Sequence, residues 1–121
     1  MSEKELQIHN YQDNSLASEI ILVLVTTPSL ESAEKIATTI VEEHLAACVN
    51  ILPKVQSVFF WENAVQKSDE SLMLIKSTKA SFLKLQNKIL SIHDYCCPEI
   101  IAIPLHDGLD KYCAWVKEVV E

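Results

Sequence analysis

The chain has 121 residues and a formal net charge of −7, and its ten basic residues are all lysines. Its length suits one domain with its own core, and an apolar fraction of 49% indicates a globular protein. Because arginine is the usual reader of phosphates and bases, an acidic chain without it is a poor candidate for binding nucleic acid or an anionic membrane surface.

The glycine and cysteine contents exclude further classes of protein. A single glycine, Gly108, cannot build the phosphate-cradling loop of a nucleotide-binding motif, which needs several. No apolar run reaches the length of a membrane span, and the first residues contain no apolar signal segment, so we expect a cytoplasmic protein. In that compartment the four cysteines, none in a CxxC pair, are expected to be free thiols.

The first elements follow a polar start. Residues 1–18 predict a flexible arm, ahead of one folded domain at residues 19–121. The domain begins with EIILVLVTT, an apolar and β-branched run of strand length. Residues 29–45 then predict an amphipathic helix with Ser29 as its N-cap and Ile36 on its apolar stripe.

A long β region follows that helix. Pro53 predicts an edge position or a bulge in its first strand, which continues through VQSVFFW. The polar stretch ENAVQKSDE at residues 62–70 is interpreted as a hairpin connection, and SLMLIKS at residues 71–77 as the return strand.

The last third of the chain predicts a helix, a strand and a terminal helix. The second helix closes at His93, PEIIAIPL is the strand, and Asp107 is the expected N-cap of the third helix. The order β-α-β-β-α-β predicts an α+β fold, a ferredoxin-like split βαβ sandwich with a long β-hairpin and an extra C-terminal helix. Because right-handed crossovers place both helices on one face of the sheet, its other apolar face is bare, which predicts an oligomer.

The stretch HDYCCPE, which begins at His93, concentrates side chains that bind metals or transfer protons. Pro98 favours an extended Cys97, and if Cys96 is extended too, the two thiols point to opposite sides. His93, one thiol and Glu99 then fall short of the four ligands of a closed zinc site. A site that another subunit completes, suited to copper or zinc, stays open.

Lys76 is a second candidate for function. Strand alternation places it on the same face as Leu72 and Leu74, where it either reaches water or holds an anion. Glu62 and Glu70, near the hairpin, are its possible carboxylate partners. No serine lies in a GxSxG elbow and no other catalytic arrangement stands out, so we do not expect an enzyme.

Five motifs resemble, in order and spacing, the CutA family of divalent-cation tolerance proteins: EEHLAACVNILP, VFFWEN, LMLIKST, IHDYCCPEIIAIPL and GLDKYCAWV. The resemblance implies a homotrimer of ferredoxin-like subunits that is similar to the PII signalling proteins, with clefts between the subunits. It also implies a link to tolerance of copper and other divalent ions, and no established catalytic reaction.

Carried over position by position, the resemblance places six residues near the intersubunit cleft. His93 is the predicted metal ligand, and the other five are predicted to contact the bound ligand: Trp61, Glu62, Lys76, Tyr95 and Glu99. The sequence departs from the family at Asp94, commonly a proline, and at Cys96 and Cys97. Members described as copper-binding have a cysteine and a second histidine where this chain has Val25 and Ile92.

The leading hypothesis is a trimeric CutA-like protein that binds copper or another divalent cation at an intersubunit cleft. The first alternative is a PII-like module that senses a small anionic ligand through Lys76. The second is a structural scaffold whose trimer is its function and which has no role in metal binding.

Overall fold

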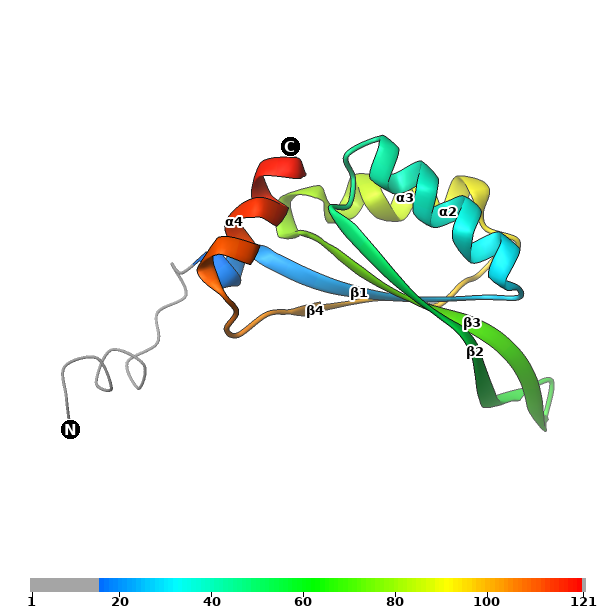
Figure 1. The fold of residues 1–121 in the computed structure, drawn as a ribbon. Coiled ribbons are helices and arrows are strands. Elements are labelled where there is room, and N and C mark those ends of the chain that lie inside the picture. Colours follow the sequence, from blue (N-terminus) through cyan, green and yellow to red (C-terminus); the bar gives the residue numbers. More distant parts are fainter. Residues whose placement is uncertain (1–15, 121) are drawn as a thin grey trace, which may run out of the picture.

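The computed structural model describes residues 16–120. The strands are β1 (Ile20–Thr27), β2 (Cys48–Trp61), β3 (Ala64–Thr78) and β4 (Ile100–Pro104). The helices are α2 (Leu30–Glu42), α3 (Phe82–Ile92) and α4 (Asp110–Val119), with the short 3-10 helices η1 (Leu16–Glu19) and η2 (Lys79–Ser81). The strands form one antiparallel sheet in the order β2-β3-β1-β4 (Figure 1). This is the predicted ferredoxin-like α+β fold, with its long hairpin and extra C-terminal helix.

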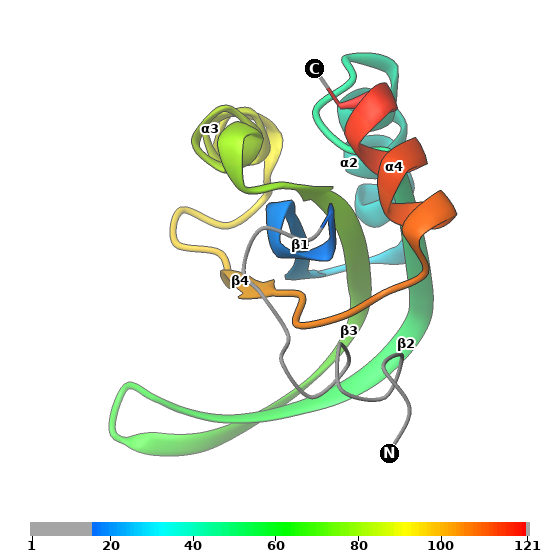
Figure 2. The same cartoon turned by 90° about the vertical axis from the view of Figure 1, so that its left-hand side faces the viewer.

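The helices α2 and α3 lie side by side on one face of the sheet (Figure 2). The strands therefore alternate between residues buried under the helices and residues on the opposite face, as Val23 and Leu24 of β1 illustrate. The main core is built from apolar residues of β1, β3, α2 and α3: Val23, Val25, Ile36, Ile40, Met73, Ile75, Leu85 and Ile89. Burial of this helix-facing row is what selects the register of the sheet.

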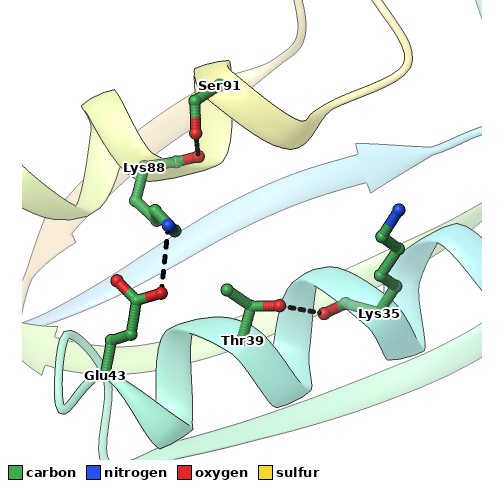
Figure 3. Close-up of polar contacts among 5 residues, drawn as sticks. All are labelled: Lys35, Thr39, Glu43, Lys88 and Ser91. Atoms are coloured by element: carbon green, nitrogen blue, oxygen red, sulfur yellow. Dashed lines mark hydrogen bonds and ion pairs between the residues drawn. The ribbon is translucent and has the colours of Figure 1, made fainter.

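Two polar contacts define the ends of α2. The hydroxyl of Ser29 accepts a hydrogen bond from the Ser32 amide at 3.1 Å, which confirms the predicted N-cap. At the other end, the Lys88 ammonium of α3 lies 3.0 Å from the Glu43 carboxylate (Figure 3). Such a surface ion pair contributes at most about 1 kcal/mol, so the two helices are held mainly by their apolar contacts with the sheet.

A second, smaller core lies beneath α4, where Ala17 and Ile20 contact Cys113 and Val116. Gly108 comes so close to this core that a Cβ would lie 3.0 Å from the Cys113 sulfur. Burial of Ala17 shows that the fold begins at η1, before residue 19. The rest of the predicted flexible arm, residues 1–15, lies outside the described residues.

The predicted N-cap of the last helix is wrong. The carboxylate of Asp107 accepts a hydrogen bond from the neighbouring Gly108 amide at 2.9 Å, two residues before the helix cap. Leu109 is the residue that precedes α4, and its side chain makes no cap hydrogen bond. Asp107 therefore shapes the approach to the helix rather than its first turn.

The hairpin connection is much shorter than predicted. Residues 62–70 were expected to form it, but strand pairing continues until Trp61 lies opposite Ala64. Only Glu62 and Asn63 form the turn, with φ values of 51° and 60°. Positive φ at both central residues is the mark of a type I′ turn, whose twist matches that of the flanking strands.

Pro53 interrupts β2, as its position in the sequence predicts. The pairing register shifts between Leu52 and Val55, where β2 contains one residue more than β3. The Pro53 carbonyl remains satisfied because the buried Ser71 hydroxyl donates a hydrogen bond to it at 2.7 Å. The irregularity is thus a β-bulge in an edge strand, where a proline costs no ladder hydrogen bond.

The face of the sheet opposite the helices is uncovered. It carries a contiguous apolar patch, which we call the open face: Leu22, Leu24, Leu72, Leu74, Ile101 and Ile103. Ile101 is 50% exposed, and at the hairpin tip Phe60 and Trp61 are 71% and 60% exposed. The predicted bare face is therefore present, and it continues into an apolar hairpin.

The two-residue turn gives a test of the hairpin geometry. We expect Asn63→Gly to raise the unfolding free energy by about 0.5 kcal/mol, because glycine adopts a φ of 60° without strain. Asn63→Val is expected to lower it by about 1 to 2 kcal/mol, since a β-branched residue is strained there. Thermal unfolding followed by circular dichroism measures both; equal melting temperatures for the two variants would contradict the I′ assignment.

Candidate functional site

A hollow of about 970 Å³ lies where the hairpin leaves the sheet, beside the segment that connects α3 to β4. The β-strands contribute Thr26, from the end of β1, and Glu70, from β3. The hairpin tip contributes Trp61 and Glu62, and the connecting segment contributes its residues from Asp94 to Cys97 and Glu99. The hollow thus brings together four of the six predicted site residues: Trp61, Glu62, Tyr95 and Glu99.

His93 holds one wall of the hollow in place. Its Nε2 lies 2.8 Å from the Thr26 carbonyl oxygen, and its Nδ1 lies 2.9 Å from the Tyr95 amide nitrogen. Because a carbonyl only accepts, Nε2 donates its hydrogen to Thr26 and Nδ1 accepts from Tyr95, which is the pattern of a neutral imidazole. A metal ligand needs a free lone pair on one nitrogen, so the predicted metal role of His93 requires one of these bonds to break.

Tyr95 and Glu70 join the connecting segment to β3. The phenol donates a hydrogen bond to the Glu70 carboxylate at 2.9 Å. Burial, this hydrogen bond and the negative charges of Glu70 and Asp94 together raise the pKa of Tyr95 to about 12. The tyrosine therefore stays protonated at neutral pH and acts as a donor that points Glu70 at the hollow.

Asp94 anchors the same segment to α2. Its carboxylate accepts a hydrogen bond from the Ser32 hydroxyl, one turn into the helix. A carboxylate near a helix N-terminus also interacts favourably with the helix dipole. Asp94 thus holds the start of the connecting segment against α2 through a side-chain contact.

The hairpin tip supplies the far wall. The Trp61 indole donates a hydrogen bond to the Glu62 carboxylate at 3.1 Å, and the Gln66 side-chain amide donates to the Trp61 carbonyl at 3.2 Å. Both carboxylate and indole are exposed, so this wall is open to solvent in the single subunit. A partner that approaches the hairpin would complete it.

Lys76 does not belong to the hollow. Its predicted face is confirmed, since it lies with Leu72 and Leu74 on the side of β3 away from the helices. Six residues of strand separate it from Glu70, about 20 Å at the usual rise per residue. Its ammonium group donates to the Asn50 side-chain oxygen and to the Leu74 carbonyl, at 3.4 Å for the latter. The expected partners Glu62 and Glu70 are therefore wrong.

Both adjacent cysteines line the hollow, and both are exposed free thiols. An extended backbone would have turned them to opposite sides. Instead the chain bends from Asp94 to Cys97, because His93 and Asp94 tie its start to Thr26 and to α2. Alternation by two applies only to extended chain, so the condition on which the predicted separation of the thiols rested, an extended Cys96, is not met.

Among the residues of the site that were not predicted are Thr26, Glu70 and Asp94. Thr26 contributes mainly its backbone carbonyl, which no side-chain pattern reveals. Glu70 was placed in a loop because the hairpin connection was predicted too long. Asp94 was noted only as a departure from the family. Period-two alternation beyond Leu72 is the signal that would have placed Glu70 on the same face as Leu74.

The hollow is negatively charged. Four carboxylates line it, from Glu62, Glu70, Asp94 and Glu99, and none of its lining residues is a lysine. Within residues 16–120, no three side chains of His, Cys, Asp or Glu lie close enough together to enclose a metal ion. The arrangement therefore attracts cations by charge but does not form a closed coordination shell in one subunit.

Residues 21–119 match the family model of the CutA1 divalent ion tolerance protein. The chain belongs to the CutA family. It is 43% identical over 97 residues to the divalent-cation tolerance protein CutA of Thermus thermophilus, covering 80% of this chain and 94% of that one. It is 42% identical to the chloroplastic protein CutA of Arabidopsis thaliana, covering 88% of this chain and 58% of that one.

Solved CutA structures share the fold. The Thermus thermophilus protein superposes with a TM-score of 0.83 at 41% identity, covering 84% of this chain and 99% of its own. CutA1 from Oryza sativa gives 0.84 at 38% identity, covering 88% of this chain and 98% of its own. Relatives are described as chloroplastic and, for Archaeoglobus fulgidus, periplasmic. Among residues 16–120, no helix has the length and apolar character to cross a membrane.

The Tyr95–Glu70 contact predicts a pH response. We expect the Tyr95 phenol to titrate near pH 12 and, in Glu70→Gln, closer to its ordinary value of 10, because the neutral amide removes one negative charge. Since the folded-state pKa is raised, the stabilisation from the protonated phenol is complete below about pH 10 and is lost as the pH rises through 12. Near-ultraviolet absorbance of the phenolate, with Tyr95→Phe subtracted, measures the titration; identical curves for wild type and Glu70→Gln would refute it.

Proposed function

We propose that this CutA protein binds a divalent cation in the hollow between its hairpin and its α3–β4 segment. The observation that carries this proposal is the set of four carboxylates around a hollow whose lining includes no lysine. Oxygen donors of this kind suit divalent cations, and the family is described by its tolerance of divalent ions. Copper is one such ion, and the thiols of Cys96 and Cys97 add donors that suit it.

We further propose that the functional unit is a homotrimer, with the hollow completed at the boundary between subunits. The open face and the hairpin tip expose a contiguous apolar surface that a lone subunit in water would have to leave unburied. The side of the hollow formed by Trp61 and Glu62 is open to solvent. A neighbouring subunit on this surface supplies the missing coordination, which fits the absence of a closed metal site within residues 16–120.

The PII-like alternative has less support. This alternative needs a positively charged side chain in the ligand cleft to hold a small anion, and Lys76 was the candidate for that role. Lys76 is engaged with Asn50 at a distance from the carboxylate-lined hollow, whose charge repels anions. No observation favours a purely structural scaffold over the cation-binding role.

Calorimetric titration with Mn²⁺ and Cu²⁺ tests the cation site. We expect Glu70→Gln combined with Glu99→Gln to weaken Mn²⁺ binding about tenfold or more, because two charges that attract the ion are removed. Glu118→Gln is the matched control, since Glu118 lies on α4 at the opposite end of the sheet (Figure 1). A wild-type protein that binds neither ion, or a double variant that binds Mn²⁺ as tightly as wild type, would overturn the proposal.

The oligomer is tested on the open face. Ile101 is half-exposed in one subunit, so Ile101→Glu leaves the monomer fold intact but places a charge in the proposed interface. We expect the mass in solution, measured by light scattering, to fall from that of three chains to that of one. Leu83→Glu on α3, where the leucine is 65% exposed, should leave the mass unchanged. A trimer that persists in Ile101→Glu, or a wild-type protein with another mass, would refute this assembly.

A further inference from the structure

We propose that Cys96 and Cys97 act together as a thiolate pair that makes the hollow prefer soft divalent cations over hard ones. The inference deepens the proposed function and rests on it, because it names the chemical class of cation that the acidic hollow takes.

The first observation is geometric. Cys96 and Cys97 are neighbours in sequence, both are free, both are exposed, and both line the same hollow. Both residues lie in the bent segment that His93 and Asp94 hold through their contacts with Thr26 and Ser32. The pair therefore borders the hollow without any rearrangement of the sheet.

The second observation is that the other two cysteines are not available in this way. Cys113 is fully buried against Gly108 beneath α4. Cys48 lies at the start of β2, where it interacts with Tyr112 of α4. Both lie at the opposite end of the sheet from the hollow. Among the four thiols of the chain, the adjacent pair is the one that faces the proposed cation site.

The chemistry of sulfur decides which cations gain from the pair. Carboxylates suit hard divalent ions such as Mn²⁺, whereas thiolates select soft or borderline ions such as Cd²⁺, Zn²⁺ or copper. Each bound thiol gives up its proton to solvent, so one M²⁺ forms two metal–sulfur bonds and releases about two protons. The product is a neutral dithiolate complex, and Glu99, two residues after Cys97, is the nearest carboxylate in sequence to add an oxygen donor.

The surrounding carboxylates assist this exchange. Their negative charge attracts divalent cations to the hollow. A cation bound there favours the thiolate form of the sulfurs that coordinate it. The carboxylates thus concentrate any divalent cation in the hollow, and the sulfurs retain the soft ones.

The experiment compares Cd²⁺ with Mn²⁺ on the fully reduced, full-length protein. Calorimetry measures both affinities, and the ultraviolet charge-transfer absorption of cadmium thiolate reports sulfur binding directly. For Cys96→Ser combined with Cys97→Ser, we expect Cd²⁺ affinity to fall about tenfold or more, the absorption to vanish, and Mn²⁺ affinity to stay unchanged. Each single variant should lose most of the absorption, and Cys48→Ser, the matched control, should retain it.

The outcomes distinguish a failure of the thiolate pair from a failure of the proposed cation site. A wild-type protein that takes up both ions, with a double cysteine variant that keeps its Cd²⁺ affinity, overturns the thiolate pair and leaves the carboxylate site standing. A single variant that behaves as wild type, or a loss of the absorption in Cys48→Ser, also overturns the pair. A wild-type protein that binds neither ion overturns both proposals. Release of about two protons per Cd²⁺, measured in buffers of different ionisation enthalpy, supports the pair.

Discussion

The one-sided covering of the sheet is the constraint on which the rest of this structure depends. Two right-handed β-α-β crossovers place α2 and α3 on the same face, so each strand has one row of residues in the core and one row outside it. The outer row is apolar in the middle of the sheet. Where the hairpin extends beyond the sheet, the row is polar on β3 and includes exposed aromatic side chains on β2. The apolar part is the surface on which we place the proposed subunit contact, and the polar part borders the hollow.

The hollow owes its shape to a few contacts at the edge of that sheet. His93 uses both ring nitrogens to connect Thr26, near the end of β1, with the segment after α3, while Asp94 reaches α2 itself. Tyr95 then secures the segment to Glu70 of the hairpin. His93, the metal ligand predicted from the sequence, thus holds the backbone of the segment that lines the hollow.

The features predicted correctly from the sequence are those that burial dictates. Apolar periodicity in residues 20–27 and 30–42, the Ser29 cap and the bulge at Pro53 all follow from local chemistry and are present. The extent of the hairpin was not predictable in the same way, because the strands beyond the helices face solvent and carry no apolar alternation. The direction of Cys96 and Cys97 depends on contacts made by residues far apart in the chain, such as Asp94 with Ser32. Rules based on neighbouring residues in the sequence cannot predict such long-range contacts.

The bulge in β2 also determines which side chains form the hairpin wall. Before it, even-numbered residues such as Asn50, opposite Leu74, lie on the open face of the sheet; after it, odd-numbered ones such as Phe59, opposite Gln66, take their place. One extra residue therefore reverses which side chains of β2 face outward, from the bulge to the end of the strand. Deleting this extra residue would turn Phe59 and Trp61 away from the wall of the hollow and turn Phe60 toward it. A change in the length of this one strand would therefore alter several side chains of the hollow together, without any substitution.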